Sequence, residues 1–176
     1  MGKRNYLIEG VSGTGKTTVA EELLRRGYHV VDGDVELAYR GYPETGKPLD
    51  KLDHEKALNN PEFGQKHWIW DIGKIKSIVA DHSKAITFFC GGSRNFQNFI
   101  DLLDGVFVLE VADINEVLRR IDERVARDPT DWGGKPEERE LIARVHATKE
   151  DTPKGIVIDS TAPLAQVVDE ILHKCR

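Results

Sequence analysis

Short apolar runs alternate along this chain with longer segments in which apolar residues recur every three or four positions. The short runs predict five β-strands, at residues 6–8, 28–31, 85–90, 105–111 and 155–158. The periodic segments predict helices after the first run, over about 63–82, 96–103, 114–127 and 136–149, and from 164 onward. Strands separated by helices favour an α/β fold, in which helices cover both faces of a parallel sheet. We expect a single such domain over residues 1–176.

The stretch between the second and third predicted strands is the least regular part of the chain. Turn formers and charged residues dominate residues 37–60, which we expect to be irregular or to form short helices. Apolar residues then follow at i, i+4, i+7 and i+11 from Trp68, so residues 63–82 are predicted to form one amphipathic helix. Trp68 and Trp70 would be one core and one edge residue of that helix.

Composition and charge narrow the class of protein. Of the 176 residues, 39% are hydrophobic and 31% are charged, which is typical of a globular domain. The formal net charge of -5 provides no positive field that would draw the protein to nucleic acid or anionic lipid. We therefore expect neither nucleic-acid nor membrane partners. With only Cys90 and Cys175, no apolar stretch of membrane-spanning length and no signal peptide, a cytoplasmic location is predicted.

The turn after the first strand has the spacing of a phosphate-binding loop, Gly-x-x-x-x-Gly-Lys-Thr. Glycines let backbone N–H groups converge on a phosphate, and the N-terminus of the following helix adds a positive dipole. Lys16 would reach the β- and γ-phosphates of ATP, and the Thr17 hydroxyl would bind Mg²⁺. A plain glycine-rich turn would not explain why a lysine and a threonine fall in this register. The predicted nucleotide-binding residues of the loop are Gly10, Ser12, Gly13, Thr14, Gly15, Lys16, Thr17 and Thr18.

Two carboxylates follow the second predicted strand, in the sequence Asp32-Gly33-Asp34. Asp-Gly is also a common turn, which is the simpler interpretation. In open α/β sheets, however, ligands bind beyond the carboxyl ends of the strands. We therefore predict that Asp34 is the catalytic base for an acceptor hydroxyl and that Asp32 lies on the metal side.

Two further groups could serve phosphoryl transfer. Gly91, Gly92 and Arg94 follow the third strand and could approach an acceptor, or could simply form a strand-to-helix turn. Arg120, Arg124 and Arg127 form one stripe on the helix over 114–127, next to a glycine- and proline-containing loop. Such a stripe is either a solvated face or a set of arginines delivered to the transferred phosphate by a mobile segment.

Aromatic residues gather between the second and third strands, where they could stack on a planar acceptor. They are Tyr39, Tyr42, Phe63, Trp68 and Trp70. The Asp-x-Asp and Gly-Gly pattern instead favours a polyol or hydroxy acid, so the residues leave the acceptor open. The histidines show no metal-ligand spacing.

With these motifs in this order, the chain resembles the small P-loop kinases, a group that includes shikimate, gluconate and nucleoside-monophosphate kinases. The resemblance implies a five-stranded parallel sheet in the order 2-3-1-4-5, an acceptor-binding region over about 35–84 and a closing lid over about 120–140. It also implies lid arginines at Arg120, Arg124 or Arg127 and a later substrate arginine at Arg144. Finally, it implies a turn near adenine that contains Ser160, Thr161 and Pro163. No arginine follows Arg40 in the acceptor segment, where a shikimate kinase holds its substrate carboxylate.

These observations predict an ATP-dependent kinase that phosphorylates a small-molecule acceptor with the help of Mg²⁺. The alternative is a nucleotide-dependent switch acting through a protein partner, since residues 131–134 have the form D-x-x-G and residues 148–151 the form T-K-x-D. Both segments fall in a predicted loop or at a helix end, where a GTPase would not use them. A third possibility is a nucleotide-binding subunit without enzymatic activity. It would not explain why Lys16, Thr17 and the Asp-x-Asp carboxylates occur together.

Overall fold

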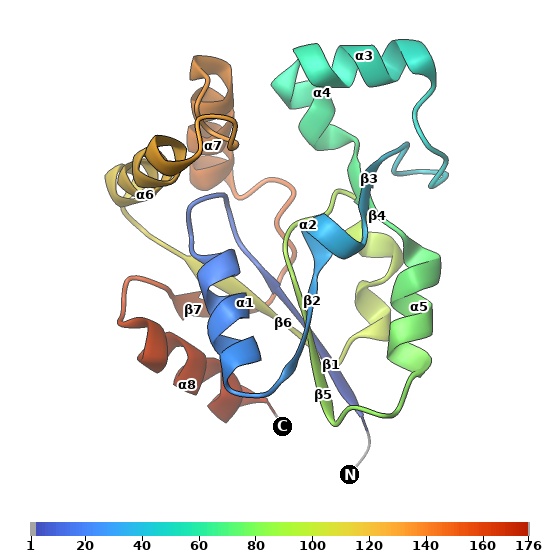
Figure 1. Cartoon of the computed structure of the whole chain (residues 1–176), viewed down its shortest axis with the longest axis vertical. Helices are drawn as coiled ribbons and strands as arrows, with labels where there is room; N and C mark the ends of the chain where they lie inside the picture. The colour runs from blue at the N-terminus through green and yellow to red at the C-terminus, as the bar shows by residue number, and fades with distance from the viewer. Residues whose placement is uncertain (1–2, 176) are drawn as a thin grey trace.

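A computed structural model describes residues 3–175. Its centre is a five-stranded parallel sheet in the order β2-β5-β1-β6-β7 (Figure 1). The strands are β1 (Arg4–Glu9), β2 (His29–Asp32), β5 (Ile86–Cys90), β6 (Gly105–Glu110) and β7 (Ile156–Asp159). Counted along the chain, these five strands give the expected order 2-3-1-4-5. The labels differ from that count because β3 and β4 form a separate, unpredicted two-stranded sheet.

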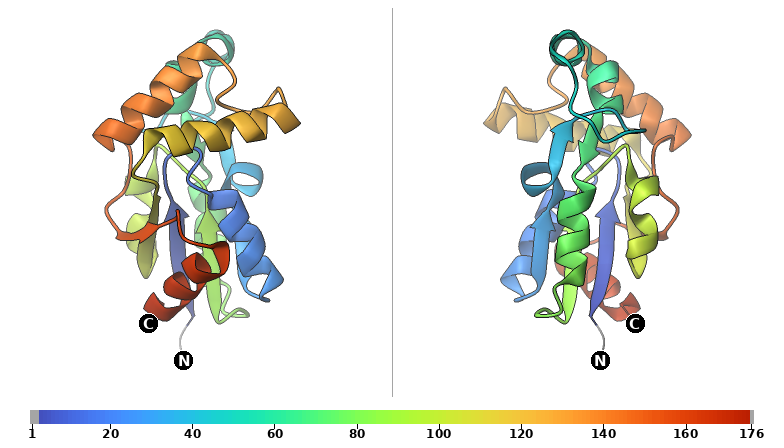
Figure 2. Two further views of the ribbon diagram at one scale, coloured as in Figure 1. Left: turned by 90° about the vertical axis from the view of Figure 1, so that its left-hand side faces the viewer. Right: turned by 90° about the vertical axis from the view of Figure 1, so that its right-hand side faces the viewer.

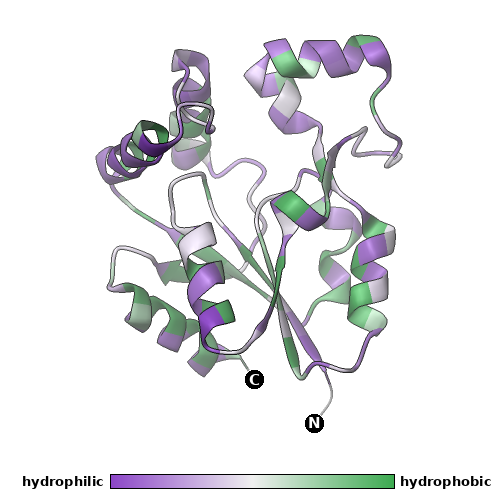
Figure 3. Cartoon of the chain, viewed as in Figure 1, coloured by the Kyte–Doolittle hydropathy of each residue, from purple (hydrophilic) through white to green (hydrophobic). Residues whose placement is uncertain are grey.

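Helices cover both faces of the central sheet (Figures 1 and 2). On one face lie α1 (Lys16–Arg25) and α8 (Leu164–Lys174), and on the other lie α5 (Ile72–Ala80) and the short 3₁₀ helices η1 (Phe96–Asn98) and η2 (Ile100–Leu102). Neighbouring residues of a strand point to opposite faces, so Phe88 packs in the first layer and Phe89 in the second. The central strands therefore carry apolar residues on both sides, and Figure 3 colours much of their length as hydrophobic.

Two helical arms rise above the carboxyl ends of the strands (Figure 1). One contains α6 (Ile114–Arg127) and α7 (Pro136–Thr148), and the other contains α3 (Lys51–Asn59) and α4 (Pro61–Lys66). The first arm is anchored by a third apolar cluster, in which Val11 of the glycine-rich loop packs with Val117 and Ile121 of α6. A Cβ at Gly13 would lie 3.0 Å from Val117 Cγ1, so α6 packs directly against the loop.

The expectation of one helix over residues 63–82 is wrong. The chain forms α4, then β4 (Trp68–Trp70), then α5. The strand forms because β4 pairs antiparallel with β3 (Ala38–Arg40) and because the Asn95 side chain binds both the N–H and the C=O of Trp70, at 3.0 Å each. Trp70 is buried and stacks on Phe99, whereas Trp68 is half-buried. One core and one edge tryptophan were expected, but on a helix.

Two other segments also differ from expectation. The helix predicted over 96–103 is replaced by η1 and η2. Residues 37–60 contain a short helix, α3, as expected, but also the strand β3, which was not expected. The short helix α2 (Gly33–Glu36) follows β2 directly. The remaining predicted strands and helices occur within a few residues of their expected bounds. No helix within residues 3–175 is long and apolar enough to cross a membrane.

Candidate active site

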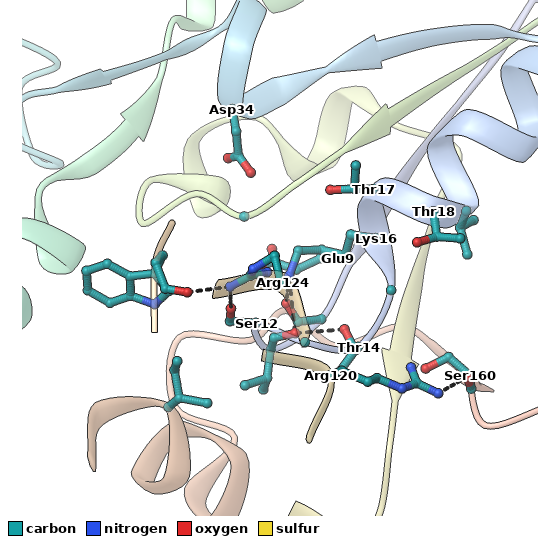
Figure 4. Close-up of a pocket in the computed structure, with 18 of the residues that line it drawn as sticks. Glu9, Ser12, Thr14, Lys16, Thr17, Thr18, Asp34, Arg120, Arg124 and Ser160 are labelled. Carbon is teal, nitrogen blue, oxygen red and sulfur yellow. Dashed lines mark hydrogen bonds between the residues drawn. The ribbon is translucent and has the colours of Figure 1, made fainter. Parts of the chain in front are cut away.

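A cleft of about 1110 Å³ lies between the two arms, with the glycine-rich loop at its base. It opens at the carboxyl ends of the strands, where parallel α/β sheets bind their ligands. Its volume is sufficient for a nucleotide together with a second small molecule. Figure 4 shows Lys16 and Thr17 of α1 facing this space together with Asp34 of α2.

The loop from Gly10 to Gly15 has the backbone geometry of an anion cradle. Gly13 and Gly15 have φ angles of 84° and 97°, which only glycine adopts easily. A Cβ at Gly10 would lie 2.6 Å from the Leu109 carbonyl oxygen, so a side chain there would collide with β6. The Thr14 hydroxyl donates to the Val11 carbonyl at 2.7 Å and stabilises the turn. No side chain caps α1, whose N-terminus therefore presents its dipole to the cleft.

Lys16 lies at the centre of this cradle. Its ammonium group donates to the carbonyl oxygens of Gly10 and, at 3.2 Å, of Val11. Burial lowers the pKa of Lys16, and the nearby carboxylates of Glu9 and Asp34 act in the opposite direction. Ser12, Thr17 and Thr18 also line the cleft, so the whole predicted loop lies at the site.

The structure separates the two predicted carboxylates. Asp34 lines the cleft, and its Oδ1 accepts a 3.1 Å hydrogen bond from the indole N–H of Trp68. Partial burial raises the pKa of Asp34, while Trp68 and Lys16 act to lower it. Asp32 does not line the cleft: its Oδ1 accepts the backbone N–H groups of Asp34 and Val35, at 3.1 and 3.2 Å, and caps α2. Asp32 thus sets the position of Asp34 through the short helix.

The turn after β5 brings the backbone close to both carboxylates. A Cβ at Gly91 would lie 3.1 Å from Asp34 Oδ1, and one at Gly92 would lie 3.0 Å from Glu9 Oε1. Side chains at these positions would crowd Asp34 and Glu9, which explains the two glycines. Arg94 also lines the cleft, but its guanidinium group is occupied by Glu9 Oε1 at 3.3 Å.

The arginine stripe of α6 lines the cleft. This position favours a role in binding phosphate over a role as a solvated helix face. Arg120 donates to the Ser160 carbonyl at 3.0 Å, next to the loop. Arg124 donates to the Ser12 hydroxyl at 3.1 Å and pairs with Asp131 at 3.1 Å (Figure 4 shows the Ser12 bond). Arg127 lies at the outer rim, where it is exposed.

Five predicted residues do not line the cleft: Asp32 and Gly91, described above, and Arg144, Thr161 and Pro163. Arg144 bridges α7 to α4, pairing with Glu62 at 3.1 Å and with Glu150 at 2.7 Å. It does not line the cleft, where a contact with substrate was expected. Thr161 binds the Asp159 carboxylate, at 2.9 Å through its N–H and 2.6 Å through its hydroxyl. Pro163 does not line the cleft either, whereas Ser160 of the same turn does.

Several cleft residues were not singled out from the sequence. Among them are Glu9, Arg40, Gln65, Trp132 and Thr152. The Arg40 guanidinium carbon lies 5.4 Å from the centre of the Trp68 ring, and Nη1 donates to the Gly64 carbonyl at 2.6 Å. Glu9 had a local signal, because a charged residue directly follows the apolar run of residues 6–8. Arg40 had none, since only the pairing of β3 with β4 places it in the wall.

The donor groups at this site fit Mg²⁺ bound together with a nucleotide. Within residues 3–175, no group of three or more histidine, cysteine, aspartate or glutamate side chains could hold a metal. Mg²⁺ at kinase sites needs only one or two protein oxygens, since waters and substrate phosphates complete its octahedron. The Thr17 hydroxyl at the start of α1 is one such oxygen.

Comparisons with known proteins support the fold. No protein-family model and no curated protein matches the chain. Solved structures do match over nearly all of it: a Janibacter sugar kinase has 17% identity and a TM-score of 0.56, covering 97% of this chain and 93% of that one. The fold is that of the small P-loop kinases.

Two other solved structures support the same fold. A shikimate kinase from Bacteroides thetaiotaomicron has 14% identity and a TM-score of 0.56, with 97% of both chains covered. A gluconokinase from Sinorhizobium meliloti has 17% identity and a TM-score of 0.52, covering 97% of this chain and 90% of that one. At these identities the P-loop kinase fold is shared, and substrates have to be inferred from this chain's own cleft.

Proposed function

We propose that this protein is an ATP-dependent kinase that transfers the γ-phosphoryl group to a hydroxyl of a small-molecule acceptor. One observation carries the proposal. The phosphate-binding loop with Lys16 and the carboxylate of Asp34 open into the same cleft, faced by the arginines of α6. A nucleotide-binding protein without transfer chemistry would not need a carboxylate and an acceptor-sized space beyond the loop.

The proposed ATP site consists of groups that attract the negatively charged phosphates. The loop N–H groups and the dipole of α1 bind the phosphates, and Lys16 turns toward the β- and γ-phosphates. Arg120 and Arg124 stabilise the charge that spreads over the transferred group. Bound Mg²⁺, with Thr17 as a ligand, would supply charge neutralisation on the phosphate oxygens. Since Asp32 caps α2, the proposal gives it a positioning role. The resemblance to small P-loop kinases would put the purine ring near Ser160, which lines the cleft.

The acceptor half lies between Asp34 and the second arm. Asp34 is fixed by the Trp68 indole and can orient an acceptor hydroxyl, while Gln65 and Arg40 add polar groups to the same wall. Arms that approach each other over the cleft would exclude water, so that transfer to the acceptor outcompetes hydrolysis. Proteins of the same fold named sugar kinase, gluconokinase and shikimate kinase favour a hydroxyl-bearing acceptor of this size.

The switch alternative has no support from these contacts. Asp131, in the D-x-x-G segment, forms an ion pair with Arg124 in the lid. The T-K-x-D segment follows α7, and its Asp151 lies beside Arg94. Neither segment directly follows a sheet strand, where GTPases carry these motifs.

The test is ADP release from ATP and Mg²⁺ in the presence of a panel of nucleosides, nucleotides, sugars, gluconate, shikimate and aminoglycosides. We expect one class of acceptor to stimulate ADP release and to gain a phosphate detectable by mass spectrometry. Lys16→Ala should abolish this transfer with the fold intact. Lys84→Ala, an exposed lysine away from the cleft, is the matched control and should behave as wild type. Substantial transfer by Lys16→Ala would contradict the proposal.

A further inference from the structure

Glu9 is the most unusual polar group in the cleft. It ends β1 directly before the loop, lines the cleft and is only 2% exposed. Its Oε1 pairs with Arg94 at 3.3 Å, but its Oε2 has no hydrogen-bond partner within residues 3–175. A buried carboxylate oxygen without a partner is unfavourable for folding, so a purely structural role does not account for it.

The orientation of Glu9 is set by a second layer of contacts. Arg94 holds Oε1, and the other end of the guanidinium group donates to the Asp151 carbonyl at 3.0 Å. Asp151 has a φ of 59°, in the left-handed region that non-glycine residues seldom adopt. Strain of this kind persists only where surrounding contacts enforce it. The turn after α7 therefore keeps Arg94 in place, and Arg94 leaves one Glu9 oxygen free.

The charged groups around Glu9 come from four elements. Arg94 and Lys16 favour its ionised form, whereas Asp34 and Asp151 disfavour it. Burial outweighs these charges and raises the pKa of Glu9 from 4.5 to about 7. A carboxylate in this range accepts a proton near neutral pH and still returns it to water afterwards.

We propose that Glu9 accepts the proton of the acceptor hydroxyl and that Asp34 orients that hydroxyl, an inference that rests on the kinase function proposed above. The acceptor O–H bond breaks and its proton moves to the Glu9 carboxylate, whose buried Oε2 has no hydrogen-bond partner within residues 3–175. A bond forms between the acceptor oxygen and the γ-phosphorus, and the bond from the γ-phosphorus to the oxygen that it shares with the β-phosphate breaks. ADP leaves with that oxygen, and Glu9 later releases the proton to solvent.

Asp34 is less suited to take the proton. Its Oδ1 is engaged by the Trp68 indole, and the residue is more than a third exposed at the cleft wall. Burial raises the pKa of Asp34, but the hydrogen bond from Trp68 and the nearby Lys16 ammonium both favour its ionised form and oppose that shift. Such a group aligns a hydroxyl well. Two carboxylates in different environments can thus divide orientation and proton transfer between them.

The experiment compares the pH dependence of kcat/KM for wild type, Glu9→Gln and Asp34→Asn, with the acceptor found by ADP release. Wild type should gain activity as pH rises through about 7. Glu9→Gln should lose roughly 10²- to 10⁴-fold in kcat and lose this pH dependence, because an amide cannot accept the proton. Asp34→Asn should lose activity but keep a pH dependence, displaced to lower pH because the Asp34 charge raises the pKa of Glu9. An unchanged pH dependence in Glu9→Gln, or a loss of less than about tenfold, would overturn the inference.

Controls separate this role from a structural one. Glutamine can still accept from Arg94, so Glu9→Gln should keep its circular dichroism spectrum and bind ATP with Mg²⁺ as tightly as wild type in calorimetry. Glu110→Gln changes a glutamate at the end of the neighbouring strand β6, outside the cleft, and should leave kcat/KM unchanged. If Glu9→Gln fails to fold, Glu9→Asp is the second test. It should lower kcat and keep the pH dependence, and unaltered kcat would contradict the role.

The outcomes also distinguish the two proposals. If wild type transfers phosphate and Glu9→Gln does so equally well, only the role of Glu9 fails. If wild type releases no ADP with any acceptor and binds no ATP, the kinase function fails, and the role of Glu9 fails with it.

Discussion

Glu9 also makes the stability of the protein depend on pH in a way that needs no substrate. Burial raises its pKa from 4.5 to about 7, so the folded state favours the protonated carboxyl more than the unfolded state does. The stabilisation is fully present below pH 4.5 and is lost as pH rises through about 7. Replacing the carboxyl with an uncharged amide in Glu9→Gln removes this dependence while keeping the acceptor for Arg94.

The magnitude follows from the shift. A change from 4.5 to about 7 corresponds to about 3 kcal/mol, since one pKa unit is worth about 1.4 kcal/mol. Wild type and Glu9→Gln should have similar free energies of unfolding at pH 4.5, and the variant should be more stable by up to about 3 kcal/mol at pH 8. For a chain of this length, that difference corresponds to roughly 6 to 12 °C in Tm.

Differential scanning calorimetry of both proteins between pH 4.5 and 8 measures this difference directly. Other titrating groups contribute to both curves and largely cancel when one is subtracted from the other. Glu110→Gln is again the control, and its Tm should follow that of wild type at every pH. Parallel curves for wild type and Glu9→Gln would refute the reasoning, because they would show that the carboxyl titrates alike in the folded and unfolded states.

Further predictions concern the rest of the cleft and the core. Asp34→Asn should reduce kcat far more than ATP affinity, and equal effects in kinetics and calorimetry would argue against its role at the acceptor. Arg124→Ala should lower kcat by about 10²-fold or more, because it removes charge from the transferred phosphate. Arg144→Ala, which breaks an exposed ion pair between α4 and α7, should change unfolding free energy by less than about 1 kcal/mol and leave kcat within twofold. Trp70→Ala should cost about 3 to 5 kcal/mol in urea unfolding, and a much smaller cost would contradict its place in the core.

Much of the fold could be predicted from local patterns. Five apolar runs separated by periodic helical segments specify a parallel sheet covered on both faces, and the structure confirms it. The phosphate-binding loop from Gly10 to Thr17 was equally predictable from the sequence. Its chemistry depends on the φ angles of its glycines and on a lysine directly after the last glycine of the motif. Both kinds of signal lie within a few consecutive residues. The stripe of arginines on α6 was visible for the same reason, although the sequence left open whether it faced solvent.

Other features depended on contacts between distant residues. Trp68 fits a helical period with the apolar residues that follow it, but pairing with β3 and the hydrogen bonds from Asn95 make residues 68–70 a strand and place Arg40 in the cleft wall. Arg144 had the right residue type, yet its ion pairs hold it between the arms.

The sequence by itself thus determined the order of the elements and the phosphate-binding loop, because periodicity and backbone angles are local properties. Only the tertiary structure decided which carboxylates face the cleft and in which direction the pKa of each is shifted. Asp32 became a helix cap, and Glu9 became a buried base candidate. Burial and the distances between charges arise only when remote segments pack together.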